Sequence, residues 1–278
     1  MLVIDVENEL DLENTLTCGQ IFRYQQEIDN SFTVVISDRV INLKYDNYKL
    51  YVKSNKLDNL ENVIREYLDL DRDYKSIMDK IRVMDSTLAK YLDNSLGLKM
   101  IKQDKLECII SYVISQNNSV RNIQMSLNML SEAYGEKVEF LNKEYYLFPK
   151  LDRLVSLSLE DFRKCKVGFR DKYLVGIIES INNGNFNLNM IDTLNTEEAL
   201  QYLINFKGIG MKVASCILLF SYQRFDVYPV DTWVKKFMED NYNIVGEKNI
   251  REYCKKKYGE YSGLAIQYMF NSKRNMNV

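Results

Sequence analysis

The hydrophobic pattern of this chain changes period near residue 57, and the change separates a β part from a helical part. Before it lie short segments rich in β-branched and aromatic residues, separated by Asp, Asn and Ser, at 19–24, 31–36, 39–43 and 48–52. After it, apolar residues recur at helical spacing, first at Leu60, Val63, Ile64, Tyr67 and Leu68. We therefore predict an α+β chain in which a small N-terminal antiparallel sheet precedes a large helical body.

The helical pattern continues almost to the end of the chain. Helices are predicted at 104–116, 119–134, 159–165, 170–182, 196–205, 211–222, 231–241, 247–257 and 261–273. We divide the 278 residues into an N-terminal sheet domain with a helical extension, 1–84, and a helical domain, 85–278.

The absence of histidine limits the chemistry open to this chain. It excludes Ser-His-Asp and Cys-His catalysis, histidine-ligated zinc and imidazole acid/base work. The five cysteines are widely spaced, and no two form a C-x-x-C pair, so we expect reduced thiols and no metal site. Catalysis is left to Lys, Asp, Glu, Cys, Tyr or backbone groups.

Charge is distributed unevenly along the chain. Residues 201–278 hold 12 Lys or Arg and 7 Asp or Glu, whereas the whole chain has a formal net charge of −2. A basic C-terminal quarter would suit a polyanionic partner, but charge alone favours the ordinary explanation, a solvated helix surface. The start of the chain carries no basic segment before an apolar run, and no stretch approaches a membrane span. We expect a cytoplasmic protein with no membrane partner.

The most specific stretch runs from residue 203 to residue 220. Gly208 and Gly210 bracket one apolar residue between two predicted helices. Glycines there allow a sharp turn and expose backbone N–H groups at the start of the second helix, where the helix dipole favours an anion such as a DNA phosphate. A plain helical hairpin with a glycine cap is the alternative.

Lys212 and Asp231 are candidate catalytic residues. Lys212 falls in the first turn of the second helix, where the dipole favours the neutral amine that can attack carbon, although an exposed lysine with no role fits too. Asp231 follows Pro229 as a predicted N-cap, whose backbone N–H groups should keep the carboxylate ionised. Sequence spacing does not show whether the two side chains meet.

These segments resemble a known family. Phe206-Lys-Gly-Ile-Gly-Met-Lys212, followed by Pro229-Val-Asp231, is similar to the signature of the helix–hairpin–helix (HhH-GPD) DNA glycosylase superfamily. Within it the chain is identified as a bacterial member of the 8-oxoguanine DNA glycosylase/AP lyase branch, and the resemblance covers nearly the whole chain. It implies that Lys212 is the nucleophile and Asp231 its partner carboxylate.

The resemblance also implies a base pocket. Thr17-Cys-Gly-Gln-Ile-Phe-Arg23 is similar to a family segment whose glycine carbonyl accepts a hydrogen bond from the N7–H of the oxidised base, which assigns that role to Gly19. Cys216 and Phe270 match the two residues that sandwich the extruded base. A target base must leave the stack, so such an enzyme needs a pocket with apolar faces and polar groups at the base edge.

Two further segments imply contacts with DNA. Within 114–118, Asn117 matches the residue that fills the gap left by the flipped nucleotide. Within 167–173, Phe169 matches the wedge and Arg170 matches a residue that contacts the orphaned base. The expected partner is double-stranded DNA containing 8-oxoguanine, with no protein partner implied.

At the hairpin, Gly208 and Gly210 are expected to bind DNA phosphate through their backbone. Lys207 replaces a proline that is usual in the family and adds a candidate phosphate contact. No cofactor is implied, and a monovalent cation at the hairpin is left open.

The chain departs from the family pattern at three places. The second arginine that contacts the opposite cytosine in eukaryotic members aligns with Asn122, and Arg121 precedes it. Ile266 stands where a base-edge glutamine is expected, and Gln267 is adjacent. Trp233 replaces a histidine after the aspartate.

Three alternative functions remain at this stage. Glycosylases for thymine glycol or mismatched adenine commonly carry a four-cysteine iron–sulfur cluster near the C-terminus, where this chain has only Cys254. The alkylated-base branch usually lacks a lysine at the hairpin position. A non-catalytic module could use the hairpin as a phosphate clamp alone.

Overall fold

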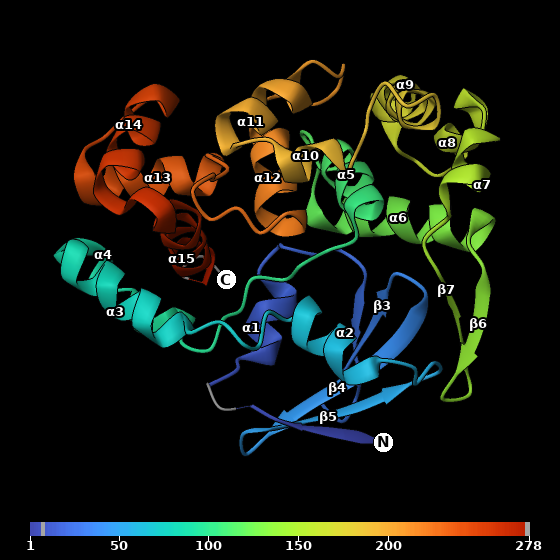
Figure 1. Ribbon diagram of the computed structural model, residues 1–278, viewed down its shortest axis with the longest axis horizontal. Helices are drawn as coiled ribbons and strands as arrows, with labels where there is room; N and C mark the ends of the chain where they lie inside the picture. Colours follow the sequence, from blue (N-terminus) through green and yellow to red (C-terminus); the bar gives the residue numbers. More distant parts are fainter. Residues whose placement is uncertain (7–8, 276–278) are drawn as a thin grey trace.

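The N-terminal part of the protein is a five-stranded antiparallel sheet (Figure 1). The computed structural model describes residues 1–6 and 9–275. The strand order is β1-β5-β4-β3-β2, and the central pair is in register with Leu43 opposite Val52. The strands are β1 (Leu2–Asp5), β2 (Tyr24–Gln26), β3 (Phe32–Ile36), β4 (Arg39–Asp46) and β5 (Lys49–Ser54).

Two helices, α1 (Leu12–Thr17) and α2 (Leu60–Tyr67), pack on this sheet. Leu16 and Ile64 are fully buried in the same cluster as the strand residue Leu43. The predicted strands at 31–36, 39–43 and 48–52 are confirmed, because one face of each is buried in this core.

The strand predicted at 19–24 is wrong. Gly19 has a φ of +88°, which interrupts extended backbone. The buried Gln20 side chain donates to the carbonyl of Lys99 at 2.7 Å and accepts from the N–H of Ile101 at 2.8 Å, so the segment is fixed by side-chain hydrogen bonds. The other two strands of the sheet are β1, which the sequence pattern did not indicate, and β2, which begins only at the last residue of that segment, Tyr24.

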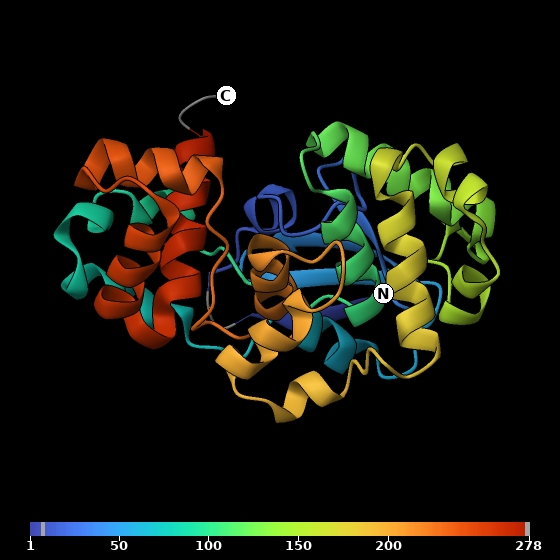
Figure 2. The same ribbon diagram turned by 90° about the horizontal axis from the view of Figure 1, so that it is seen from above.

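The helical body forms two groups of helices on either side of α12, as the view in Figure 2 shows. Each of the nine predicted helices is present, with ends within two residues of those expected. The helices are α3 (Tyr74–Met84), α4 (Ser86–Ala89), η1 (Leu92–Ser95), α5 (Lys105–Ile114), α6 (Val120–Tyr134), α7 (Leu151–Val155), α8 (Leu159–Lys164), η2 (Gly168–Arg170), α9 (Asp171–Asn182), α10 (Met190–Thr193), α11 (Thr196–Ile204), α12 (Met211–Ser221), α13 (Thr232–Tyr242), α14 (Glu247–Tyr258), η3 (Gly259–Tyr261) and α15 (Ser262–Asn275).

A second, two-stranded sheet was not predicted. Strands β6 (Lys137–Phe140) and β7 (Lys143–Tyr146) form a hairpin beside α6 (Figure 1). Leu141 and Asn142 at its tip have φ values of 50° and 59°. Two successive positive φ angles fit a tight hairpin turn, but without glycine the sequence gives little sign of it.

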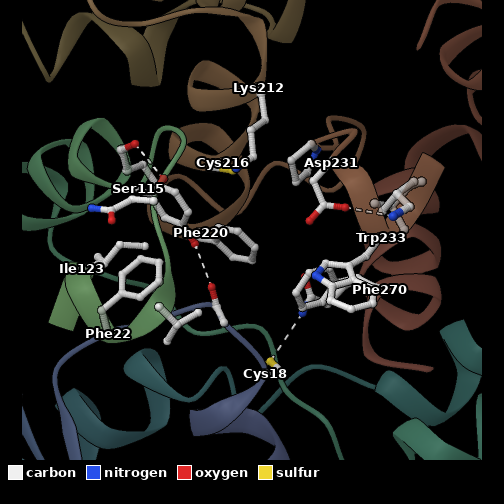
Figure 3. A pocket seen from close by; sticks show the side chains of 18 residues that line it. Cys18, Phe22, Ser115, Ile123, Lys212, Cys216, Phe220, Asp231, Trp233 and Phe270 are labelled. Carbon is white, nitrogen blue, oxygen red and sulfur yellow. Dashed lines mark hydrogen bonds between the residues drawn. The ribbon is translucent and has the colours of Figure 1, made fainter. Parts of the chain in front are cut away.

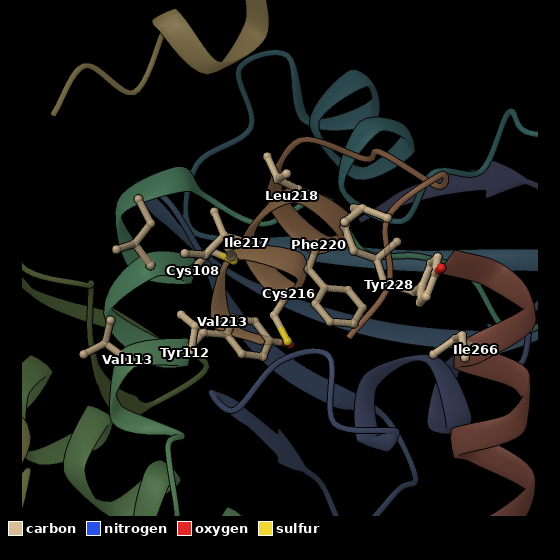
Figure 4. Close-up of a cluster of buried hydrophobic side chains, with 14 of the residues drawn as sticks. Cys108, Tyr112, Val113, Val213, Cys216, Ile217, Leu218, Phe220, Tyr228 and Ile266 are labelled. Atoms are coloured by element: carbon tan, nitrogen blue, oxygen red, sulfur yellow. The ribbon is translucent and has the colours of Figure 1, made fainter. Parts of the chain in front are cut away.

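Helix α12 is the centre of the helical core (Figure 4). Every residue from 213 to 221 is buried, and the helix packs against the apolar helix α5. A helix that is apolar on all sides is stable only when neighbours surround it. Leu70 packs with the sheet cluster, whereas Tyr74 of α3 packs with the helical cluster. The domain boundary at residue 84 stays a prediction.

Asp85 ties α3 and α4 to the C-terminal helices. One carboxylate oxygen accepts the hydroxyl groups of Tyr258 at 2.6 Å, Tyr242 at 3.0 Å and Tyr253 at 3.2 Å. The other accepts two backbone N–H groups at the start of α4. Burial raises the pKa of Asp85, but these hydrogen bonds, led by that of Tyr258, outweigh burial and lower it overall.

Across residues 1–6 and 9–275, no helix combines the length and the apolar character needed to span a membrane.

Candidate active site

A pocket of about 200 Å³, here called the central pocket, lies where the sheet domain meets the two groups of helices (Figure 3). Its walls come from the segment after α1 and from α5, α6, α12, α13 and α15. The lining residues include Cys18, Gly19, Phe22, Tyr112, Ser115, Lys212, Cys216, Phe220, Asp231, Trp233, Ile266, Gln267 and Phe270. Six predicted site residues from four distant segments are therefore brought together: Gly19, Lys212, Cys216, Asp231, Gln267 and Phe270.

Lys212 reaches the pocket from the first turn of α12. Gly210 is the N-cap of this helix and has no side chain to accept from it, so the backbone N–H groups of the first turn have no side-chain cap. Gly208, two residues earlier, has a φ of +99°, and a Cβ there would lie 2.6 Å from the Cβ of Tyr173. Only glycine fits this turn, and the turn fixes where α12 starts.

Asp231 is the N-cap of α13, as predicted, and accepts the N–H of Val234 at 2.9 Å. Burial raises the pKa of Asp231, whereas the Val234 N–H bond and the positive charge of Lys212 act in the opposite direction. Burial therefore outweighs the cap, and the pKa of Asp231 is raised overall. That the carboxylate is ionised at neutral pH stays a prediction. The N-terminal ends of α12 and α13 converge on one pocket, which spacing alone did not show (Figure 3).

Two apolar groups from different helices line the same pocket. Cys216 lies one turn after Lys212 on α12, and burial raises the pKa of its thiol to about 12, so it is a neutral apolar group near pH 7. Phe270 comes from α15, and its ring lies 3.5 Å from the position that a Cβ of Gly19 would take. Gly19 thus brings its backbone close to an aromatic face of the pocket.

The floor of the pocket carries a polar cluster. The hydroxyl of Tyr112 donates to the carbonyl of Gln20 at 2.8 Å. The side-chain amide nitrogen of Gln267 donates to the sulfur of Cys18 at 3.4 Å (Figure 3). Ile266 and Gln267 both line the pocket, which settles their location but leaves their roles as predictions.

A second hollow of about 480 Å³, here called the adjoining groove, opens beside the central pocket. The two share Lys212, Asp231 and Trp233. Asn117, exposed with a φ of 47°, also lines the groove. A DNA strand lying in this groove would pass Lys212 and Asp231, the catalytic candidates, and Asn117, the residue expected to fill the gap left by a flipped nucleotide.

Phe169 and Arg170 occupy different environments although they are neighbours. The Phe169 side chain is 52% exposed at the surface. The guanidinium of Arg170 is buried and donates to the carbonyls of Gln116 at 2.9 Å, Val167 at 2.9 Å and Asn117 at 3.2 Å. Arg170 therefore fixes the loop that carries Asn117, and its contact with an orphaned base stays a prediction.

The hairpin is connected to that same loop. The Gln116 side chain donates to the carbonyl of Gly208 at 2.9 Å. Lys207 and Gly210 are exposed next to it. The predicted phosphate-binding backbone and the predicted gap-filling residue are thus held in one unit.

Sequence reasoning missed Cys18, Tyr112 and Phe220 as pocket residues. Tyr112 and Phe220 stack with ring centroids 5.5 Å apart, and both lie on apolar helices. Their pattern is that of ordinary core residues, so no local signal marks them.

A glycine hairpin, a lysine on the helix that follows it and an aspartate capping the next helix, all on one pocket, are the arrangement of the helix–hairpin–helix DNA glycosylases. Comparisons with known proteins specify the branch. The family described as 8-oxoguanine DNA glycosylase, N-terminal domain, matches residues 2–109.

Full-length relatives agree with this match. An N-glycosylase/DNA lyase of Arabidopsis thaliana is 28% identical over 281 residues, covering 94% of this chain and 77% of the relative. The Clostridium acetobutylicum 8-oxoguanine glycosylase/lyase, solved with double-stranded DNA containing cytosine opposite 8-oxoguanine, is 34% identical with a TM-score of 0.93, covering 100% of this chain and 99% of the other. Its apo form is 36% identical with a TM-score of 0.92, covering 97% and 95%. The chain belongs to the 8-oxoguanine DNA glycosylase/lyase family.

Proposed function

We propose that this protein excises 8-oxoguanine from duplex DNA and then cuts the strand as an AP lyase. The observation that carries the proposal is the meeting of Lys212 and Asp231 on a pocket that also presents Gly19, Cys216 and Phe270. An amine and a carboxylate beside a pocket with apolar walls are the groups that lysine-based excision of an extruded base requires.

The chemistry follows from these groups. As the bond between C1′ and the base nitrogen breaks, positive charge develops on the sugar, and the ionised Asp231 carboxylate stabilises it in a site sheltered from water. The neutral amine of Lys212 attacks C1′, one of its protons passes to the departing base and the other to O4′ as the sugar ring opens, and the product is a Schiff base. The Schiff base acidifies the hydrogens at C2′, so loss of one proton expels the 3′ phosphate by β-elimination.

Recognition of the oxidised base is assigned to the Gly19 carbonyl. In 8-oxoguanine N7 carries a hydrogen, whereas in guanine N7 is an acceptor that would meet the carbonyl unfavourably. Support for this assignment comes from the position of Gly19, which lines the central pocket with its backbone close to the Phe270 ring. Cys216 and Phe270 are assigned to the two faces of the base.

Binding of the duplex is assigned to the surface around the adjoining groove. Exposed Phe169 serves as the wedge and Asn117 fills the gap, with Arg170 fixing the Asn117 loop and contacting the orphaned base. The hairpin backbone at Gly208 and Gly210 binds phosphate.

Lys207 adds a phosphate contact at the same hairpin. The reaction itself uses no cofactor, and a monovalent cation bound to hairpin carbonyls would support phosphate binding alone. A duplex DNA substrate would place a bacterial enzyme of this kind in the cytoplasm with the chromosome.

Borohydride trapping on an 8-oxoguanine duplex tests the proposal. Lys212→Gln should abolish both excision and the trapped adduct, and Asp231→Asn should slow excision while leaving binding largely intact. Lys236→Gln is the matched control, because this exposed lysine lies on α13 but does not line the pocket. Efficient trapping of Lys212→Gln would identify another amine as nucleophile, and a wild-type protein that shifts the duplex without cutting it would be a binding module.

A further inference from the structure

The sulfur of Cys18 is the centre of a buried hydrogen-bond cluster beneath the central pocket. The side chain is fully buried, and its sulfur accepts the amide N–H groups of Gln20 at 3.3 Å and of Gln267 at 3.4 Å. Its S–H donates to the carbonyl of Thr15 at 3.6 Å. Burial raises the pKa of the Cys18 thiol, so the group stays protonated and this pattern is kept at neutral pH.

Gln20 holds the sulfur in place. Its amide nitrogen also donates to the Lys99 carbonyl at 2.7 Å, and its amide oxygen accepts the Ile101 N–H at 2.8 Å. These two opposed contacts determine which end of the Gln20 amide faces Cys18. The cluster is therefore anchored to backbone on one side, and on the other side Cys18 and Gln267 both line the central pocket.

The side-chain amide oxygen of Gln267 is the part of this residue that can bind a ligand. Because its amide nitrogen faces Cys18, its oxygen is turned to the other side, and among residues 1–6 and 9–274 no group donates to that oxygen. The residue is 4% exposed and lines the central pocket. A glutamine that could rotate would present either a donor or an acceptor, whereas this one presents an acceptor.

We propose that Cys18 is a positioning residue that holds the Gln267 amide with its oxygen toward the base, so that the pocket selects purines with hydrogen-bond donors at N1 and at the 2-position. The proposal rests on the proposed function. Guanine-type bases carry an N1–H and a 2-amino group side by side, and one amide oxygen can accept from both. Adenine-type bases carry an acceptor at N1, which would face the amide oxygen without a hydrogen bond.

The test compares single-turnover excision of 8-oxoguanine and 8-oxoadenine from otherwise identical duplexes. In Cys18→Ala the amide is free to rotate and to donate to N1 of 8-oxoadenine, so the ratio of the two rates should fall about fivefold, the value of one neutral hydrogen bond. Cys18→Ser, which keeps an acceptor and a donor, should restore the ratio. Cys254→Ala removes another fully buried thiol that does not line the pocket and should leave the ratio unchanged.

A double-mutant cycle separates positioning from a general structural effect. Gln267→Met keeps the length of the side chain without its amide, so adding Cys18→Ala to Gln267→Met should change the ratio no further. Cys18→Val fills the space of the thiol but accepts no hydrogen bond. It replaces Cys18→Ala in this test if the alanine variant does not fold. An unchanged ratio in a folded variant, or full additivity with Gln267→Met, would overturn the role of Cys18. A wild-type protein that leaves 8-oxoguanine in place would instead overturn the proposed function.

Discussion

Replacing Asp85 by alanine should destabilise the protein more than any ordinary loss of a helix cap. The substitution removes the acceptor shared by three tyrosine hydroxyls and both bonds that cap α4. Loss of a cap costs about 1 kcal/mol. The hydroxyl of Tyr258, which is 1% exposed, is left without its carboxylate partner, and an unsatisfied buried polar group costs about 2 kcal/mol more. We expect a total loss of about 3 kcal/mol in the free energy of unfolding.

Asp73→Ala is the matched control for this experiment. Asp73 also caps a helix, accepting the N–H of Ser76 at 2.9 Å, but it has no buried tyrosine partners. Urea denaturation at pH 7 should therefore give a loss of about 1 kcal/mol for Asp73→Ala. Equal losses for the two variants would refute the contribution assigned to the tyrosine hydroxyls.

The dependence on pH gives a second check on Asp85. Its pKa is lowered by folding, so the stabilisation is present above the ordinary aspartate value of 3.8 and is lost as pH falls through the lower folded value. The difference between wild type and Asp85→Ala should accordingly shrink below about pH 4. A difference that stayed constant through that range would contradict the hydrogen-bond cause given for the lowered pKa.

Three further predictions concern the site. Gly208→Ala should weaken DNA binding in a gel-shift assay and lower the free energy of unfolding by more than about 1 kcal/mol. The cause is the φ of +99° and the 2.6 Å distance between an added Cβ and the Cβ of Tyr173, which both oppose a side chain. Wild-type affinity for DNA would contradict the role of the hairpin. Phe169→Ala should change the unfolding free energy by less than about 0.5 kcal/mol, since the ring is 52% exposed, yet slow excision in single-turnover assays. Because burial raises the pKa of Asp231, excision should begin to fall on acidification at a pH above 3.8; a rate that fell only below that pH would argue against Asp231 acting as the anion.

Sequence periodicity predicted the fold where burial is regular along one element. In the strands at 31–36 and 39–43, apolar residues alternate with polar ones or follow one another, because the sheet has one buried face. The long helices carry apolar residues along one side at helical spacing. The segment at 19–24 has the same composition, but distant backbone groups hold Gln20 in a loop. Tertiary hydrogen bonds of this kind leave no local trace in the sequence.

The candidate site was predictable only in part, for a related reason. The hairpin glycines and Asp231 follow local rules for turns and caps, so the residues around them could be selected from sequence. That Lys212 and Asp231 line one pocket, and that Cys18 contacts a glutamine 249 positions later, depends on how α12, α13 and α15 are assembled. The resemblance supplied the order of the motifs, and the structure supplied their convergence.

Trp233 gives the protein a built-in optical signal. It is the single tryptophan of the chain and lies on the boundary between the central pocket and the adjoining groove, two positions from Asp231. Because indole emission responds to the polarity around the ring and to stacked bases, its intensity would follow the arrival and departure of DNA without any added label. The order of base extrusion, bond cleavage and product release could thus be timed in the native enzyme by stopped-flow fluorescence.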